Sequence, residues 1–529
     1  MISYTRDEVR SIEPLLSELH WHYASQILAA TEIVAQSERA YPVLITSFKC
    51  SPDAFVIDYF KKLMESHAKP YLVLQLDEHD SRVGYETRVE AAVRAFRNHA
   101  SSSVIMPHTA AARYASSILP AKEKHLMGKT LVLPNWDDLS LRLIVASLRH
   151  EGIDARLLEE NPETIQRSLR YNSGQCIPLN IIAQEFIEYI EKYDLNPSRT
   201  LLWLGASRIA CNIKMYPTHI KSLLQSYGKG MEKAGIYTGS MSLQDISLKM
   251  PVTAYFAYMF GGYIRRIGCK LRPYENIKGM TDKMIEKSME ILSEAFLTGR
   301  SKEASLAEAM SYFQDIAITP GDRSKVAIFG DMYARDNKVM NQDLTGFIEA
   351  NGGEVITTPY TAYTKMIAKP YLRKWFVEGH YLEVLFSAAL IAGLKLREKT
   401  YYKYFERILD EPDPIYDESP GKILSAYNIQ IENIGESMDN ILKLHYIRKY
   451  HPDVSLFVQA SPAFCCPSLV TEAMARKIEK KTGVPLVSVT YDGTGGNKNE
   501  VVIPYLRYPR GQKFEASGAS FSPPEHGLI

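Results

Sequence analysis

Six cysteines are the residues of this chain whose side chains are best suited to redox or metal chemistry. No C-x-x-C pair and no cysteine followed by a nearby histidine occurs among them, so the usual signatures of a zinc site are absent. Any metal bound by their thiolates would therefore need ligands from distant segments of the chain. The six are Cys50, Cys176, Cys211, Cys269, Cys465 and Cys466.

Cys50 follows a predicted strand and precedes Ser51 and Pro52, where a helix is expected to begin. A helix N-terminus lowers the pKa of a cysteine, and binding sites in open α/β sheets lie at the carboxyl ends of the strands. This position therefore favours a thiolate ligand. The alternative is that Cys50 is a small hydrophobic residue that fills a buried corner.

Three further positions repeat this arrangement of a strand or turn, a cysteine and a helix. Cys465 and Cys466 lie between the strand SLFVQA and a helix predicted from Ser468 to Lys480. Cys176 precedes the apolar helix LNIIAQEFIEYI, and Cys211 separates the strand LLWLGAS from a helix starting near Tyr216. Thiolates brought together from separate loops can hold an iron–sulfur cluster, so the pattern indicates such a site. Cys269 lies in no such junction, and a structural role is as good an interpretation for it.

The elements that position these cysteines follow an α/β pattern, in which short β-branched runs alternate with helical periods. We expect an α/β fold built from repeated open, doubly wound parallel sheets with flanking helical layers. Long helical stretches are predicted over residues 280–313 and 371–409, and a loop over 410–421. The predicted strands are 41–48, 70–76, 130–134, 201–204, 325–329, 354–357, 455–459 and 485–490, and the shorter helices are 52–64, 85–98, 137–150 and 341–350.

The 529 residues are 46% hydrophobic and 23% charged, as expected for a folded protein of several domains. The net charge is +1, from 62 basic and 61 acidic residues, which argues against nucleic acid or an acidic membrane surface as the main partner. No run of eighteen apolar residues and no signal-type segment occurs. We therefore expect a cytoplasmic protein without membrane insertion.

Several short motifs, in order along residues 37–508, resemble the C-terminal part of the large CoA-activase proteins. That family is related to the D-component of 2-hydroxyacyl-CoA dehydratases and to double-cubane cluster proteins. The matching segments are SFKCSPD at 47–53, KPY at 69–71, QLDEH at 75–79, GYETRVEA at 84–91, GQCIP at 174–178, RPYE at 272–275, NQDL at 341–344 and PAFCCP at 462–467.

The resemblance implies a dehydratase-like fold in which two units pack as a pair, each offering three cysteines to a cluster. The chain is then expected to begin inside the first unit, with Cys50 as that unit's last cysteine. Cys176, Cys211 and Cys465 match the three cysteines of a complete second unit, and Cys466 offers an alternative to Cys465. The expected divisions are residues 1–125 for the remainder of the first unit, 126–320 and 321–510 for two subdomains of the second, and 511–529 for a disordered tail.

The resemblance also implies a function. The chain is expected to be the iron–sulfur component of an ATP-driven, low-potential reductase or activase system, with a [4Fe–4S] or double-cubane cluster that passes single electrons to a difficult acceptor. An ATP-dependent reductase subunit and a chain supplying the missing first half are the implied partners. The alternatives are a scaffold subunit that lacks a cluster and a 2-hydroxyacyl-CoA dehydratase-type lyase.

No phosphate-binding G-x-x-x-x-G-K-[ST] motif occurs, and the glycine-rich segment 492–496 is best interpreted as a turn, so we expect no ATP hydrolysis by this chain alone. Two sets of polar residues each allow two interpretations. The acidic segment 77–80, which includes His79, either contacts a bound acceptor or forms a solvated loop. Arg208 and Lys214 flank Cys211 and either offset the charge of a cluster or are ordinary surface residues.

Overall fold

The computed structural model describes residues 5, 7–19, 21–47, 51–76, 82–101, 126–171, 176–205, 211–240, 243–431 and 435–509. Cys50, the segment 77–80, Arg208 and the segment 511–529 lie outside the described residues, so the predictions made for them have no structural counterpart here.

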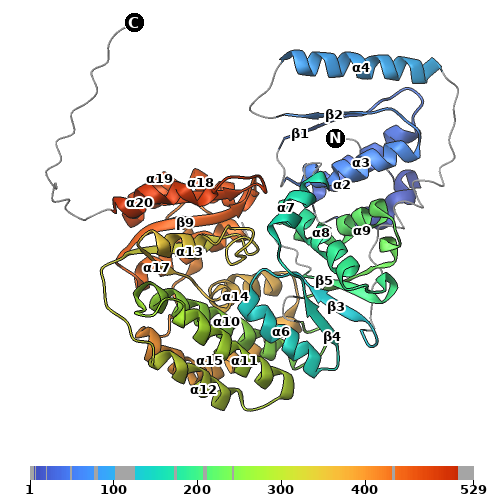
Figure 1. Cartoon of the computed structure of the whole chain (residues 1–529). Coiled ribbons are helices and arrows are strands. Elements are labelled where there is room, and N and C mark those ends of the chain that lie inside the picture. The colour runs from blue at the N-terminus through green and yellow to red at the C-terminus, as the bar shows by residue number, and fades with distance from the viewer. Residues whose placement is uncertain are drawn as a thin grey trace, which may run out of the picture.

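The described part of the chain confirms the α/β fold, with three sheets whose strands are all parallel (Figure 1). One sheet has two strands, in the order β1-β2. The others have four each, in the orders β4-β3-β5-β6 and β10-β9-β7-β8. The strands are β1 (Val43–Thr46), β2 (Leu72–Gln75), β3 (Thr130–Leu133), β4 (Asp154–Leu157), β5 (Thr200–Gly205), β6 (Gly235–Gly239), β7 (Ser324–Gly330), β8 (Gly353–Ile356), β9 (Val454–Pro462) and β10 (Leu486–Tyr491).

The central strands are buried along almost their whole length. All six residues of β5 are buried, as are eight of the nine residues of β9. Such continuous apolar runs are typical of parallel sheets. The sequence did not predict β4 or β6, whose segments DARL and GIYTG include charged residues or glycines, and both are edge strands.

Helix α6 (Asp138–His150) shows how the local sequence sets the ends of a helix. Asp137 is its N-cap and accepts a hydrogen bond from the Ser140 N–H at 3.3 Å. Beyond its C-terminus Gly152 has a φ of +81°, the left-handed conformation that glycine adopts readily. The predicted helix 137–150 is therefore confirmed.

The sequence did not predict helix α10 (Met250–Leu271). It packs against α6, which follows strand β3 of one four-stranded sheet, and against strand β8 of the other. Its adjacent glycines allow close approach on two sides: a Cβ at Gly261 would lie 2.4 Å from Ser140 Oγ of α6, and one at Gly262 would lie 2.7 Å from the Pro359 Cβ that follows β8. These contacts hold the two sheets in one body.

Three predicted helical stretches are divided in the structure. The stretch 280–313 is α11 (Met280–Thr298) and α12 (Lys302–Gln314), separated at Gly299, which has a φ of +75°. The stretch 371–409 is α14 (Tyr360–Val377) and α15 (Tyr381–Leu409), separated at Gly379, which has a φ of +86°. The predicted helix 468–480 is α18 (Cys466–Ala473) followed by α19 (Ala475–Thr482).

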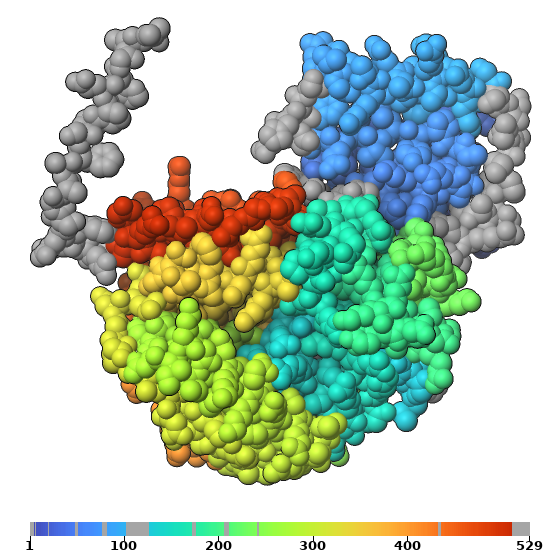
Figure 2. Space-filling view, in the orientation of Figure 1, coloured from blue at the N-terminus to red at the C-terminus, as the bar shows by residue number. Residues whose placement is uncertain are grey.

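The N-terminal lobe, described within residues 5–101, lies against the part of the chain that contains α9 (Tyr216–Tyr227) (Figures 1 and 2). Its helix α3 packs against α9, and Lys62 donates a 3.2 Å hydrogen bond to Ser226 Oγ. No described helix combines the length and apolarity needed to cross a bilayer. The remaining α-helices are α1 (Glu13–Glu18), α2 (His22–Gln36), α3 (Pro52–Ser66), α4 (Arg82–Ser101), α7 (Pro162–Ser168), α8 (Ile177–Lys192), α9 (Tyr216–Tyr227), α11 (Met280–Thr298), α12 (Lys302–Gln314), α13 (Leu344–Ala350), α16 (Pro420–Ser425), α17 (Glu436–Tyr450) and α20 (Ile503–Arg507).

Candidate functional site

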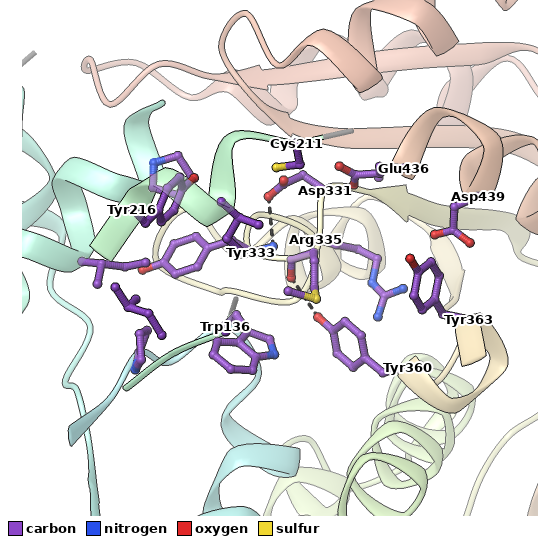
Figure 3. A pocket seen from close by; sticks show the side chains of 18 of the residues that line it. Trp136, Cys211, Tyr216, Asp331, Tyr333, Arg335, Tyr360, Tyr363, Glu436 and Asp439 are labelled. Carbon is purple, nitrogen blue, oxygen red and sulfur yellow. Dashed lines mark hydrogen bonds between the residues drawn. The ribbon is translucent and has the colours of Figure 1, made fainter. Parts of the chain in front are cut away.

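A cavity of about 210 Å³ lies where strands from both four-stranded sheets end (Figure 3). Pro134 follows β3, Gly205 ends β5 and Asp331 follows β7, and all three line it. Binding sites of open parallel sheets occur at this edge. Six of the lining residues are aromatic: Trp136, Trp203, Tyr216, Tyr333, Tyr360 and Tyr363. Six others carry polar or ionisable side chains: Cys211, Asp331, Arg335, Glu436, Asp439 and Lys443.

Cys465 lies beside two carboxylates, Asp331 and Glu436, that line this cavity. Its sulfur, a carboxylate oxygen of Asp331 and one of Glu436 all lie within 4.8 Å of one another. Cys465 is the N-cap of α18 and is only 6% exposed, whereas Cys466 is the first residue of that helix and is more exposed. The three side chains come from three separate elements, because Asp331 follows β7 and Glu436 begins α17.

Tyr216 links the other two predicted ligands to the same region. Burial raises the pKa of its phenol well above the usual range, and negative charge on the thiols of Cys176 and Cys211 raises it further. The nearby Asp331 carboxylate has the same effect on this pKa. Cys176 is buried as the N-cap of α8, and Cys211 is the N-cap of the short 3-10 helix Asn212–Met215 that leads into α9. Cys176 and Cys211 therefore both act on Tyr216, and Cys465 lies beside Asp331, which acts on the same phenol.

The backbone fixes the position of Asp331. Gly330 has a φ of +125°, and a Cβ there would lie 2.3 Å from the carbonyl oxygen of Ala460 on β9. The Asp331 N–H donates a 3.0 Å hydrogen bond to the same carbonyl. Its Oδ1 accepts hydrogen bonds from the N–H groups of Tyr333 at 2.9 Å and Ala334 at 2.8 Å. The carboxylate is thus oriented by the turn after β7.

A buried ionic network lies beneath the cavity. Asp336 pairs with Arg335 at 2.5 Å and with Arg265 at 3.3 Å, and Arg265 also binds Asp137. Burial opposes the ionised form of Asp336, but the two guanidinium groups hold the pKa of its carboxyl below the usual value. Arg335 also lies over the ring of Tyr360, 4.5 Å from its centroid. The network holds Arg335 charged at the cavity wall.

The buried polar atoms of the cavity wall that have no hydrogen-bond partner among the described residues include three on its most deeply buried side chains. They are the indole nitrogens of Trp136 and Trp203 and Oδ1 of Asp439. All three residues are at most 5% exposed. Buried polar atoms without a partner are costly, so their presence here points to a bound group that supplies the missing contacts.

The other residues singled out by the sequence lie away from this group. Cys269 is fully buried within α10, does not line the cavity, and has a pKa raised to about 11 by burial. Lys214 donates a 2.8 Å hydrogen bond to the carbonyl oxygen of Glu18. In the segment 492–496 Asp492 Oδ1 accepts hydrogen bonds from the N–H and hydroxyl of Thr494, which makes the segment a turn with a carboxylate in it.

Sequence reasoning missed Asp331, Glu436 and Tyr216. Asp331 carried a usable signal, since it comes directly after the strand KVAIFG. Glu436 carried none, because only the packing of α17 brings it to β7 and β9. In comparisons with known proteins, no family model and no curated protein matches the chain.

Proposed function

We propose that the chain is the iron–sulfur component of an ATP-driven, low-potential reductase, with Cys176, Cys211 and Cys465 as the cluster ligands. The observation that carries the proposal is that Cys211 and Asp331 line one cavity at the carboxyl ends of two parallel sheets, with the Cys465 sulfur within 4.8 Å of an Asp331 oxygen. Cys176 supports it through its effect on Tyr216, which lines the same cavity. Thiolates are the usual ligands of iron–sulfur clusters. The resemblance to the large CoA-activase proteins and to the 2-hydroxyacyl-CoA dehydratases supports the same three residues.

The surroundings of the three sulfurs suit such a cluster. Each cysteine is the residue before the first turn of a helix, where the positive end of the helix dipole favours the thiolate. The aromatic walls limit access of water, and Asp331 and Glu436 add negative charge. Burial and negative charge both disfavour the reduced form of a cluster and so lower its reduction potential. When bound, the cluster would supply one-electron transfer at low potential.

The chain's other residues have complementary roles in this proposal. Arg335 is held charged at the cavity wall by Asp336, so it can bind an acidic group of an electron acceptor. Lys443 pairs with Asp439 at 2.9 Å on the same wall. We place the protein in the cytoplasm, where thiols stay reduced. An ATP-hydrolysing subunit delivers the electrons, and a second chain completes the site to which Cys50 belongs.

Iron and sulfide analysis of the anaerobically purified full chain tests the proposal. We expect iron and acid-labile sulfide in equal amounts, and loss of most of both in Cys176→Ala, Cys211→Ala and Cys465→Ala. Cys269→Ala is the matched control, since that thiol is buried away from the cavity, and Cys466→Ala is expected to keep its iron. Full iron in all three ligand variants would overturn the proposal.

One observation favours a second candidate, a site for a single divalent ion. The oxygens of Asp331 and Glu436 together with the sulfur of Cys465 form a donor set that zinc or ferrous iron accepts. Metal without acid-labile sulfide, retained in Cys176→Ala, would favour this site. A folded chain without any metal would favour the alternative function of a scaffold subunit that lacks a cluster. Dehydration of a 2-hydroxyacyl-CoA by the activated protein would favour the alternative function of a dehydratase-type lyase.

A further inference from the structure

The outer face of helix α15 (Tyr381–Leu409) carries large apolar side chains. The inner face packs into the body of the protein, where Leu394 and Glu398 are buried and Glu398 binds Lys365 at 2.7 Å. A surface helix normally turns its apolar stripe toward the core. On the outer face of α15, however, four large apolar side chains are between 65% and 80% exposed: Leu382, Leu385, Phe386 and Leu396.

The exposed apolar residues of α15 form one stripe along the helix. Leu382, Ala389 and Leu396 are seven residues apart, and so are Leu385 and Ala392 between them. This seven-residue repeat is the pattern by which two helices pack side by side, with the side chains of one in the spaces of the other. The exposed residues of the stripe are Leu382, Leu385, Phe386, Ala389, Ala392, Gly393 and Leu396.

We propose that this stripe binds the same stripe of a second copy of the chain, with the two α15 helices antiparallel and centred on Ala389. The sizes of the side chains along the stripe point to this occupant. The large Leu385 and Phe386 come four and three residues before Ala389. The small Ala392 and Gly393 come three and four residues after it.

An antiparallel pair therefore places large side chains opposite small ones. The two large side chains of each copy lie over Ala392 and Gly393 of the other copy, and a Cβ at Gly393 would meet no atom within 4 Å in the single chain. Leu382 lies opposite Leu396 of the other copy, because both are seven residues from the centre. A two-fold interface uses the same patch on both subunits, so the patch must be complementary to itself. The stripe meets this requirement.

The area and charge of the stripe also suit a contact between two chains. Four large side chains at this exposure offer an apolar area on the order of 500 Å². That exceeds the about 400 Å² above which an apolar patch promotes association, and it is more than half of the about 800 Å² that each partner buries in a stable interface. The charged residues between Leu382 and Leu396 are Glu383 and Lys395, and both lie outside the stripe.

A bilayer surface is the other class of partner that an exposed apolar helix face can bind. Helices that lie on membranes carry large apolar side chains along the buried face. The middle of this stripe consists of Ala389, Ala392 and Gly393, which offer little apolar area to lipid but allow a second helix to approach closely. The stripe therefore favours a helix over a bilayer.

The molar mass of the full chain in solution tests the inference, measured by sedimentation equilibrium. We expect the mass of two chains for the wild type and of one chain for Leu385→Glu, because a charge in the stripe would be buried between the copies. Leu248→Glu is the matched control, since Leu248 is 89% exposed and lies outside α15, and it should keep the mass of two chains. Equal midpoints of urea denaturation verify that both variants fold.

Disulfide cross-linking tests the antiparallel arrangement. Residue 389 of one copy lies beside residue 389 of the other, so Ala389→Cys should form a disulfide-linked dimer on mild oxidation. The two copies of residue 382 lie about 20 Å apart along the helices, so Leu382→Cys should not. The wild type, oxidised in the same way, is the reference for the native cysteines.

A monomeric wild type, or a Leu385→Glu variant that keeps the mass of two chains, would overturn the inference. Cross-linking of Leu382→Cys without that of Ala389→Cys would overturn the antiparallel pairing. A monomeric wild type that binds vesicles of anionic phospholipid, with binding lost in Leu385→Glu, would assign the stripe to a bilayer and overturn it equally. None of these measurements depends on iron, so the inference and the proposed function stand or fall separately.

Discussion

The rings of Phe55 and Tyr216 stack with 6.2 Å between their centroids and 9° between their planes. Phe55 belongs to α3 of the N-terminal lobe, and Tyr216 begins α9 beside Cys176 and Cys211. Both rings are buried. The N-terminal lobe therefore supports the tyrosine on which Cys176 and Cys211 act.

Phe55→Ala is expected to weaken both stability and metal retention. Loss of a fully buried phenylalanine typically costs about 3–5 kcal/mol, and the cavity left behind would loosen the ring of Tyr216. Urea denaturation and iron analysis measure the two effects. Phe376→Ala is the control, since Phe376 is 57% exposed and its loss should change the free energy of unfolding by less than about 0.5 kcal/mol. Equal stability of both variants would contradict the packing role.

Arg265→Met is expected to destabilise the protein strongly. The Arg265 guanidinium binds both Asp137 and Asp336, so its removal takes this partner from two buried carboxylates. Breaking a buried ion pair costs about 3–5 kcal/mol. The midpoint of urea denaturation measures the loss. Lys192→Met breaks the exposed pair with Glu159 and should leave that midpoint unchanged. A small effect of Arg265→Met would mean that the network is not structurally required.

Gly330→Ala is expected to disturb the candidate site itself. The backbone at this position has a φ of +125°, and the added Cβ would lie 2.3 Å from the carbonyl oxygen of Ala460. Strands β7 and β9 would have to separate, which moves Asp331 away from Cys465. We expect lower stability and lower iron content than in Gly495→Ala, where a Cβ meets no atom within 4 Å. Indistinguishable behaviour of the two variants would contradict the close approach.

Glu160 is expected to make a contribution to stability that is lost as the pH rises from about 4 to about 8. Burial, and then the charges of Asp138 and Asp137, raise the pKa of its carboxyl to about 8, against a partial opposing effect of Lys338. Between the unfolded pKa of about 4.3 and this value the folded state holds a proton that the unfolded state releases, so the free energy of unfolding decreases with pH.

Urea denaturation at pH 5, 7 and 9 measures this dependence. Glu160→Gln cannot ionise, so its free energy of unfolding should fall less over the same range. Other buried carboxyls with raised pKa values, such as Glu349 at about 7, still make the free energy of unfolding decrease with pH in this variant. Parallel curves for the wild type and Glu160→Gln would contradict the raised pKa of Glu160.

Local sequence was enough to predict most of the fold. The apolar runs of the central strands and the helical periods after them predicted the parallel α/β architecture, because these patterns depend on neighbouring residues alone. It failed where tertiary packing overrides local preference. The edge strands β4 and β6 are examples, and so is α10, whose paired glycines weaken a helix but allow it to pack against α6 and Pro359.

The candidate site divides in the same way. The sequence by itself determined that Cys176, Cys211 and Cys465 each end a strand or turn and begin a helix, because a helix start depends on a few adjacent residues. Only the tertiary structure decided that Asp331 and Glu436 lie beside Cys465, and that Cys176 and Cys211 both act on Tyr216. The register of β7 against β9 and the packing of α17 place those carboxylates beside Cys465, and such pairings join residues too far apart in the chain for any local pattern to encode.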